Sequence, residues 1–114
     1  MPRAGDLVER VRFERRGKLD DGFGNEIAGP WAAQFERAAM FIMRPGSEAV
    51  TAARLHGQQP VTIIVRFDTQ TRAVTPDWRV VDVRTGTAYA IRAAEDMDRT
   101  RTWISLVCIA GEPT

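Results

Sequence analysis

The sequence contains very few cysteine and histidine residues, the side chains that most often act as nucleophiles or zinc ligands. Its 114 residues include one cysteine, Cys108, and one histidine, His56. A zinc site takes several Cys or His ligands, so a single subunit cannot build one. A lone cysteine also excludes an internal disulfide and fits a reducing compartment. Neither residue lies in a nucleophile motif, and there is no glycine-rich nucleotide-binding motif. We therefore expect no enzyme activity, catalytic residue, cofactor, metal or small-molecule substrate.

Long apolar runs and a strong charge of one sign are also missing. Without a run of about 18 apolar residues, no membrane span is expected, and charged residues stand where a signal peptide has its apolar core. The 16 basic and 15 acidic residues leave a net charge of +1, whereas proteins that grip DNA usually carry a basic excess. Lys18 is the only lysine, which we attribute mainly to codon bias and secondarily to arginine-mediated contacts.

What the sequence does contain is a succession of β-strand patterns within one domain, residues 1–114. Alternating or continuous apolar runs predict six strands, over residues 7–15, 31–43, 61–67, 78–84, 87–93 and 102–110. Short turns between them predict an all-β, mainly antiparallel fold, a small six-stranded barrel or sandwich. Arg37 interrupts an apolar stripe, so we expect a β-bulge near it. The last strand is apolar on both faces, which predicts a central or interface position.

Two polar stretches are predicted to be loops. Residues 17–30 hold four glycines and end in proline, and residues 95–101 are highly charged. The acidic residues in both stretches fit turns better than cation sites, because the second lacks the glycine and the distal glutamate of a calcium loop. The candidate docking residues of the first loop are Asp20, Asp21, Phe23 and Asn25.

The segment Arg44–Gln59 breaks the β pattern. A Pro-Gly turn precedes Ser47, a candidate helix N-cap, and an Ala-rich run from Glu48 to His56 predicts one short helix. So short a helix is marginal by itself, and its apolar stripe consists of small residues. We expect this helix to need a neighbour, and the segment to be the functional element of the chain.

The order of these features resembles a known family. AGDLVERVRFERR is followed by DDGFGNE, then by MRPGSEAVTAARLHGQQPVTIIVRF and DWRVVDVRTGTAYAIRAAEDMDRTRTWISLVC. Together they cover almost the whole chain and resemble the head–tail joining (head-completion, or stopper) proteins of tailed bacteriophages and gene transfer agents. The resemblance implies a small β-barrel that forms a homo-oligomeric ring, with a long loop after the second strand projecting into the DNA channel.

The resemblance also implies partners and a location. The portal or adaptor proteins would lie on the head side of the ring, and tail terminator or tail tube proteins on the tail side. Packaged double-stranded DNA would make transient, non-specific contact. The protein would sit at the head–tail interface of a phage-like particle assembled in the bacterial cytoplasm. The channel loop corresponds to Arg44–Gln59, with candidate gating residues Arg44, Ser47, Glu48, Arg54 and His56.

A second interpretation is an OB-like barrel that binds single-stranded nucleic acid. Such a barrel should expose aromatic and basic side chains on one sheet face. Here the outward positions of the first strand carry charges of both signs, such as Arg10, Arg12 and Glu14. The mixed charge makes this the weaker interpretation.

Overall fold

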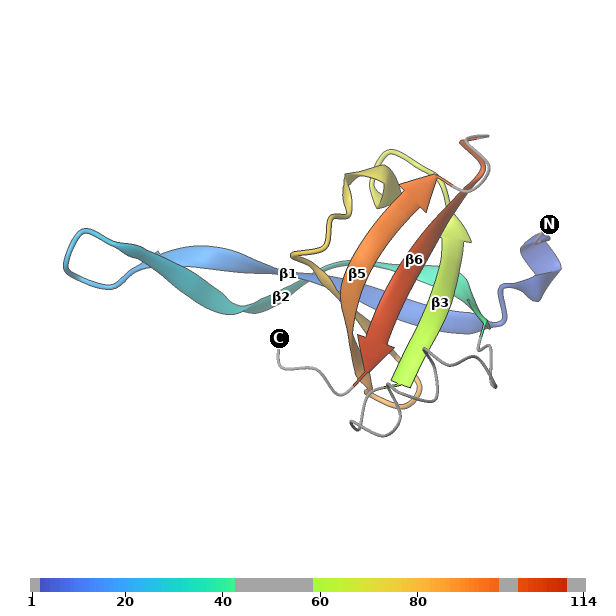
Figure 1. The fold of residues 1–114 in the computed structure, drawn as a ribbon, viewed down its shortest axis with the longest axis horizontal. Coiled ribbons are helices and arrows are strands. Elements are labelled where there is room, and N and C mark those ends of the chain that lie inside the picture. Colours follow the sequence, from blue (N-terminus) through green and yellow to red (C-terminus); the bar gives the residue numbers. More distant parts are fainter. Residues whose placement is uncertain (1–2, 43–58, 97–100, 111–114) are drawn as a thin grey trace.

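Six antiparallel strands form a closed barrel (Figure 1). The structure is a computed structural model that describes residues 3–42, 59–96 and 101–110. Around the barrel the strands follow the order β1-β2-β3-β6-β5-β4. The strands are β1 (Glu9–Asp20), β2 (Glu26–Ile42), β3 (Gln59–Arg66), β4 (Arg79–Asp82), β5 (Ala88–Asp96) and β6 (Trp103–Ala110), with short 3-10 turns η1 (Ala4–Asp6) and η2 (Thr71–Ala73).

Alternation of side chains explains why these residues close into a barrel. On each strand every second residue points inward, so apolar residues at a spacing of two share one core. Val11 and Phe13 of β1 are fully buried, as are Ile63 and Val65 of β3. Leu106 of β6 completes the same layer. The prediction of a six-stranded barrel is confirmed, and β6 lies between β3 and β5, as expected for a strand that is apolar on both faces.

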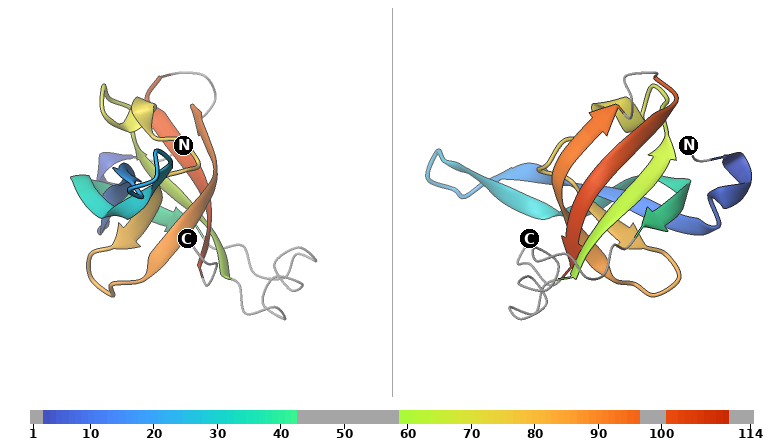
Figure 2. Two further views of the ribbon diagram at one scale, coloured as in Figure 1. Left: turned by 90° about the vertical axis from the view of Figure 1, so that its left-hand side faces the viewer. Right: turned by 45° about the vertical axis from the view of Figure 1, so that its right-hand side comes forward.

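The first two strands continue well beyond the barrel. β4 pairs with β1 only as far as Glu14, and beyond that residue β1 pairs with β2 alone. We call residues 15–32 the arm and residues 19–27 its tip. Figures 1 and 2 show the arm as a twisted two-stranded ribbon that leaves the barrel and does not fold back over it. At about 3.3 Å per residue, the six residues from Arg15 to Asp20 carry the tip roughly 20 Å outward.

The arm corrects the prediction of a loop over residues 17–30. Only residues 21–25 form the turn, and the rest of that stretch is strand. Both faces of a two-stranded ribbon meet solvent, so its strands lack the apolar alternation that marks barrel strands. Gly17 and Gly29 are not loop residues but allow the two arm strands to approach closely. A Cβ on Gly29 would lie 3.0 Å from the carbonyl oxygen of Gly17. Register shifts there and the adjacent Pro30 mark a bulge, where a missing N–H is tolerated.

The bulge expected near Arg37 was also placed wrongly. Arg37 pairs in register with Val11, and the nearest register shift on β2 falls three residues before it, at Gln34. The charge in the apolar stripe is accommodated differently. The Arg37 guanidinium lies 4.6 Å from the Phe35 ring centroid and donates to Asp68 at 2.9 Å. The ion pair with Asp68, rather than the bulge at Gln34, therefore accommodates the charge of Arg37.

The remaining strand predictions agree with the structure. The predicted strand over residues 61–67 corresponds to β3, which ends one residue earlier at Arg66. The predicted hairpin around Gly86 is the β4–β5 pair, with Gly86 at φ 78°. The predicted helix over residues 48–56 lies outside the described residues. Within the described ranges, no helix has the length and apolar character needed to cross a membrane.

Two phenylalanines allow a matched test of the core. Phe13 is fully buried and its ring centroid lies 4.9 Å from that of Phe35, whereas Phe23 at the arm tip is 88% exposed. Phe13→Ala is expected to lower the free energy of unfolding by about 3–5 kcal/mol, because removal of the ring leaves a cavity in the core. Phe23→Ala should change it by less than about 0.5 kcal/mol. Urea unfolding measures both, and equal losses would contradict this assignment of the core.

Candidate functional site

The one cysteine of the chain, Cys108, is placed as a core residue. Cys108 lies on the inner side of β6, fully buried, and burial raises the pKa of its thiol to about 12. At neutral pH it is therefore a small apolar core residue, as predicted. His56 lies outside the described residues. Among those residues no three His, Cys, Asp or Glu side chains gather as a metal site would require.

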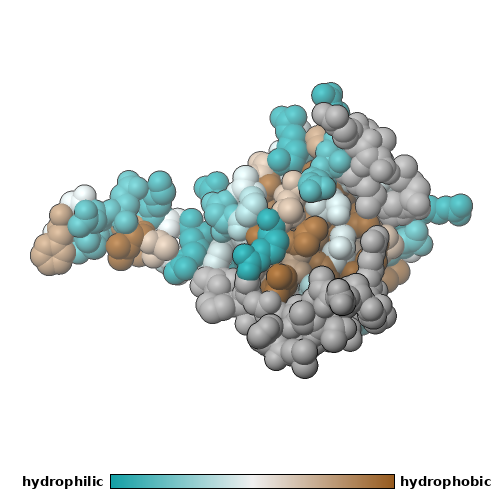
Figure 3. All heavy atoms as spheres, in the orientation of Figure 1, coloured by the Kyte–Doolittle hydropathy of each residue, from teal (hydrophilic) through white to brown (hydrophobic). Residues whose placement is uncertain are grey.

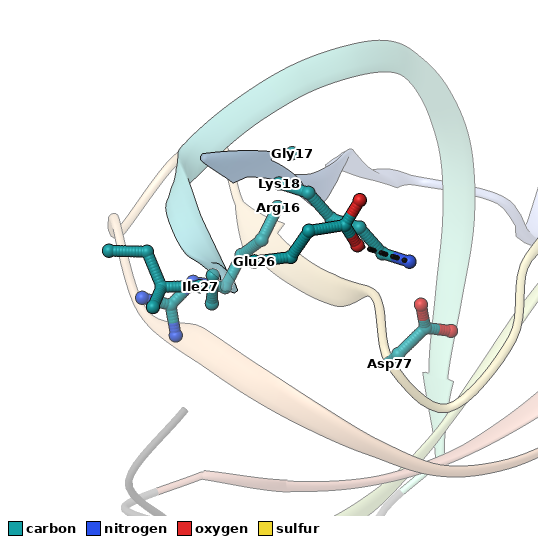
Figure 4. Close-up of a pocket in the computed structure, with 7 residues that line it drawn as sticks. Arg16, Gly17, Lys18, Glu26, Ile27 and Asp77 are labelled. Atoms are coloured by element: carbon teal, nitrogen blue, oxygen red, sulfur yellow. Dashed lines mark ion pairs between the residues drawn. The ribbon is translucent and has the colours of Figure 1, made fainter. Parts of the chain in front are cut away.

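A hollow of about 420 Å³ lies along one side of the arm. Lys18 and Glu26 form an ion pair across the arm strands at 3.4 Å, and Asp77 extends toward them from the loop before β4 (Figure 4). Arg16, Gly17, Ile27 and Ala28 complete the lining. The Lys18 and Glu26 side chains are 79% and 70% exposed. An open hollow with an exposed, self-neutralised ion pair lacks the enclosed apolar walls of a small-molecule site.

The predicted docking residues are brought together at the arm tip. Asp21 Oδ1 accepts hydrogen bonds from the backbone N–H groups of Phe23 at 2.7 Å and Asn25 at 3.2 Å. Asp20 Oδ1 accepts one from the N–H of Gly22 at 2.9 Å. The bond from Phe23 is the main reason that the pKa of Asp21 is lowered. Both carboxylates thus fix the turn through hydrogen bonds to its backbone.

Two glycines allow the turn to be this tight. Gly22 and Gly24 have φ angles of 85° and 83°, a region that disfavours residues with a Cβ. Phe23 stands between them, so its side chain is held away from the ribbon. Its exposure is therefore a consequence of the turn geometry.

The tip also carries two apolar residues that the sequence interpretation missed. Leu19 and Ile27 face each other as a cross-strand pair and are 50% and 48% exposed. Together with Phe23 they are the exposed large apolar residues of the tip, which we call the apolar cluster, and the Leu19 side chain lies back against Gly29. The signal in the sequence was the near-symmetric placement of Leu19 and Ile27 about the DDGFGN turn, which is typical of a hairpin.

Arginine–aromatic contacts hold the root of the arm. The guanidinium groups of Arg16 and Arg79 lie 5.3 Å and 4.6 Å from the Trp31 ring centroid. Arg16 Nε also donates to the carbonyl oxygen of Gly29 at 2.8 Å. These contacts tie both arm strands to β4, so they should stiffen a ribbon that would otherwise be marginal.

A buried carboxylate lies where the arm leaves the barrel. Glu14 is 6% exposed and accepts hydrogen bonds from Arg79 Nε at 2.6 Å and Arg12 Nε at 2.8 Å. Burial would raise the pKa of Glu14, but the bonds from Arg12 and Arg79 outweigh it and lower the pKa below its ordinary value of 4.5. This ion pair joins β1 to β4 at the last residue pair between them.

Glu14 should make stability depend on pH. Its folded-state pKa is depressed, so its contribution is present above about pH 4.5 and is lost as pH falls through the lower folded value. Glu14→Gln should cost about 1–3 kcal/mol at neutral pH, because it leaves Arg79 without its anion. The variant should also lose less stability than the natural protein between neutral pH and about pH 3.

The control is Glu26→Gln, which removes an exposed arm carboxylate and should change stability by less than about 0.5 kcal/mol. Urea unfolding across the pH range provides the comparison. Asp68 contributes in the same direction: burial opposes its ionisation, but the hydrogen bond from Arg37 lowers its pKa. Some pH dependence should therefore survive in Glu14→Gln, and an unchanged pH profile would show that Glu14 is not held as described.

The candidate gating residues Arg44, Ser47, Glu48, Arg54 and His56 lie outside the described residues. The structure does define where their segment attaches. β2 ends at Ile42 and β3 begins at Gln59, and Ile42 pairs with Thr62 on the neighbouring strand. The segment therefore leaves and re-enters the barrel at one end, between two adjacent strands.

The described aromatic residues do not form a base-stacking platform. The side chains of Trp78, Tyr89 and Trp103 are buried, and Phe35, Phe41 and Phe67 pack against the core. Among the described aromatics, Phe23 is the large exposed one. A single-strand-binding barrel needs several aromatic rings on an open face, so the OB-like alternative loses its main support.

The chain matches known proteins over nearly its whole length. The sequence model of the phage head completion protein family matches residues 2–111. The fold is similar to a chain in the virion of a native gene transfer agent particle, with 23% sequence identity and a TM-score of 0.61 over 88% of this chain and 90% of that chain. It is also similar to the solution structure of protein SF1141 from Shigella flexneri 2a, with 18% identity and a TM-score of 0.70 over 99% and 100% of the two chains. No curated protein matches. At these identities the two structures show a shared fold.

Proposed function

The chain belongs to the phage head completion protein family, and from that premise we propose that it is a head–tail connector of the stopper type. It forms a homo-oligomeric ring between the portal or adaptor complex and the tail of a phage-like particle, and it lines or gates the DNA channel. The near full-length family match carries this proposal. The similar chain in a gene transfer agent virion supports it, because that chain belongs to an assembled particle of this kind.

The chemistry of the barrel fits a structural role. Its described core is apolar and holds the cysteine as an inert residue, so the protein acts through contacts rather than through covalent steps. The net charge of +1 also fits a channel wall. Strong neutralisation of phosphates would hold DNA in place, whereas DNA must slide through a connector.

Two parts of the chain are assigned separate tasks in this proposal. Arg44–Gln59 is the channel element, with Arg44, Ser47, Glu48, Arg54 and His56 as its candidate contact residues. The arm tip, with Asp20, Asp21, Phe23 and Asn25, is the docking element. Attachment of the channel segment between adjacent strands at one barrel end supports this division, because the arm projects from the side of the barrel.

Deletion of residues 46–57 tests the channel assignment. The barrel strands lie on either side of the deletion, so the variant is expected to fold and to enter particles. Particles that carry it should leak DNA or fail to join tails, because the channel element is missing. The measurements are nuclease-sensitive DNA in purified particles and electron microscopy of tail attachment, in cells that lack the natural gene.

The control restores the full-length chain from the same plasmid, and circular dichroism of the purified variant checks the barrel. Absence of the gene should itself leave heads and tails unjoined. Normal tail joining without the gene would contradict the connector proposal as a whole. Normal DNA retention and transfer with the folded deletion variant would instead remove the role of this segment alone.

A further inference from the structure

Besides the arm tip, the barrel presents a second apolar surface. On the side away from the core, Met40 of β2 pairs with Ile64 of β3, and Ile42 of β2 pairs with Thr62, which in turn pairs with Val107 of β6. Val107 is 41% exposed. We call this the outer face, formed by the half-buried Met40, Ile42 and Ile109 and the exposed Val107; Ile64 lies among them but is only 1% exposed, so it is not part of the accessible surface. Figure 3 shows apolar residues gathered on the side of the barrel where β3, β5 and β6 face the viewer.

We propose that the arm tip of one copy docks on the outer face of β3 and β6 in the next copy of the chain. This inference rests on the proposed ring, and it names the contact that would build it. Both surfaces are apolar, and each chain carries one of each. The tip would bring Phe23, flanked by Leu19 and Ile27, onto the region around Val107.

The arm cannot place its tip on its own outer face. It runs outward from the barrel in every view and does not turn toward β3 and β6 (Figures 1 and 2). The Arg16–Trp31–Arg79 contacts and the Glu14–Arg79 pair fix its direction at the root. A tip that is held away from its own barrel can reach such a face only on another molecule.

The charges around the two surfaces are complementary. Asp20 and Asp21 flank Phe23 at the tip, while Lys18 and Glu26 neutralise each other farther back. On the barrel, Arg66 and Arg92 are both exposed, and Arg92 lies on β5 next to the residue that pairs with Val107. Glu95 is the acidic residue in these rows, so the outer face remains more basic than the tip. Opposite charges around apolar centres favour this pairing over tip against tip.

The contact joins unlike surfaces, so it is heterologous. Repetition of a head-to-tail contact closes into a ring when the rotation between copies permits it. One aromatic side chain with two aliphatic neighbours is small beside the roughly 1,200–2,000 Å² that a stable interface buries. The protein should therefore be monomeric when dilute and assemble when a particle surface holds several copies side by side.

Cysteine cross-linking between two variants tests the contact directly. Full-length Phe23→Cys is mixed with full-length Val107→Cys, at high concentration and within particles made in cells that produce both variants. Under mild oxidation the pair should form a disulfide-linked heterodimer, seen on a non-reducing gel. Native Cys108 is buried and should stay unreacted.

The matched control pairs Phe23→Cys with Val8→Cys. Val8 is 79% exposed, more than Val107, but it precedes β1 and lies outside the outer face. Docking on the outer face should give at least about tenfold more heterodimer with Val107→Cys than with Val8→Cys, because docking raises the effective concentration of the two thiols. Equal yields, mainly Phe23→Cys homodimers, or cross-links from Phe23→Cys to a different particle protein would overturn the inference.

A second measurement separates this inference from the connector proposal. Phe23→Ala is expected to fold normally but to form rings poorly and to reduce the yield of tailed particles by about tenfold or more. Full ring formation and tail joining by Phe23→Ala would overturn the tip contact and leave the connector role intact. The connector role itself fails only if particles join tails without the gene.

Discussion

The ion pair between Glu14 and Arg79 is the constraint on which the projecting part of the molecule depends. Glu14 is the last residue of β1 that pairs with β4, and the register of β1 against β2 shifts directly after Phe13. The strand thus passes from the core into solvent within one residue. A buried carboxylate is costly unless it is paired, so the chain can keep Glu14 there only with its arginines in place. This requirement couples the direction of the arm to the folding of the barrel.

Beyond that point the arm is held by arginine rather than by an apolar core. A hairpin alone is marginal in water, but Trp31 receives two guanidinium groups and Arg15 lies 5.6 Å from the Trp78 ring centroid. Lysine would serve these positions poorly, because its ammonium lacks the planar face that stacks on a ring. Whatever the origin of the arginine-rich composition, the structure uses arginine for contacts that lysine would make less well.

The barrel could be predicted from the sequence, whereas the arm could not. The barrel strands bury apolar residues, so alternation in β1 or a β-branched apolar run such as Val61–Val65 marks them in the sequence. The arm strands have solvent on both faces, and Gly17 and Gly29 look like loop residues although they form a close strand contact. The turn at Asp20 to Asn25 could be predicted because Asp and Gly residues mark turns locally, and its role in docking stays a prediction. The apolar neighbours Leu19 and Ile27 were missed because no hairpin was predicted there. The predicted helix between β2 and β3 stays a prediction.

An exposed phenylalanine at the end of the arm could promote aggregation. The small size of the apolar cluster and the charged residues beside it reduce that risk. Exposed apolar ribbons invite aggregation, and proteins usually counter this with charge near the edge. Here the apolar cluster is confined to the arm tip, with Asp20 and Asp21 beside Phe23 and the Lys18–Glu26 ion pair close to Leu19 and Ile27. Such a cluster is too small to hold two free molecules together, yet contacts around a closed ring reinforce one another because every copy is held on two sides. In the proposed ring, weak single contacts would therefore keep dilute copies apart until the particle brings them together.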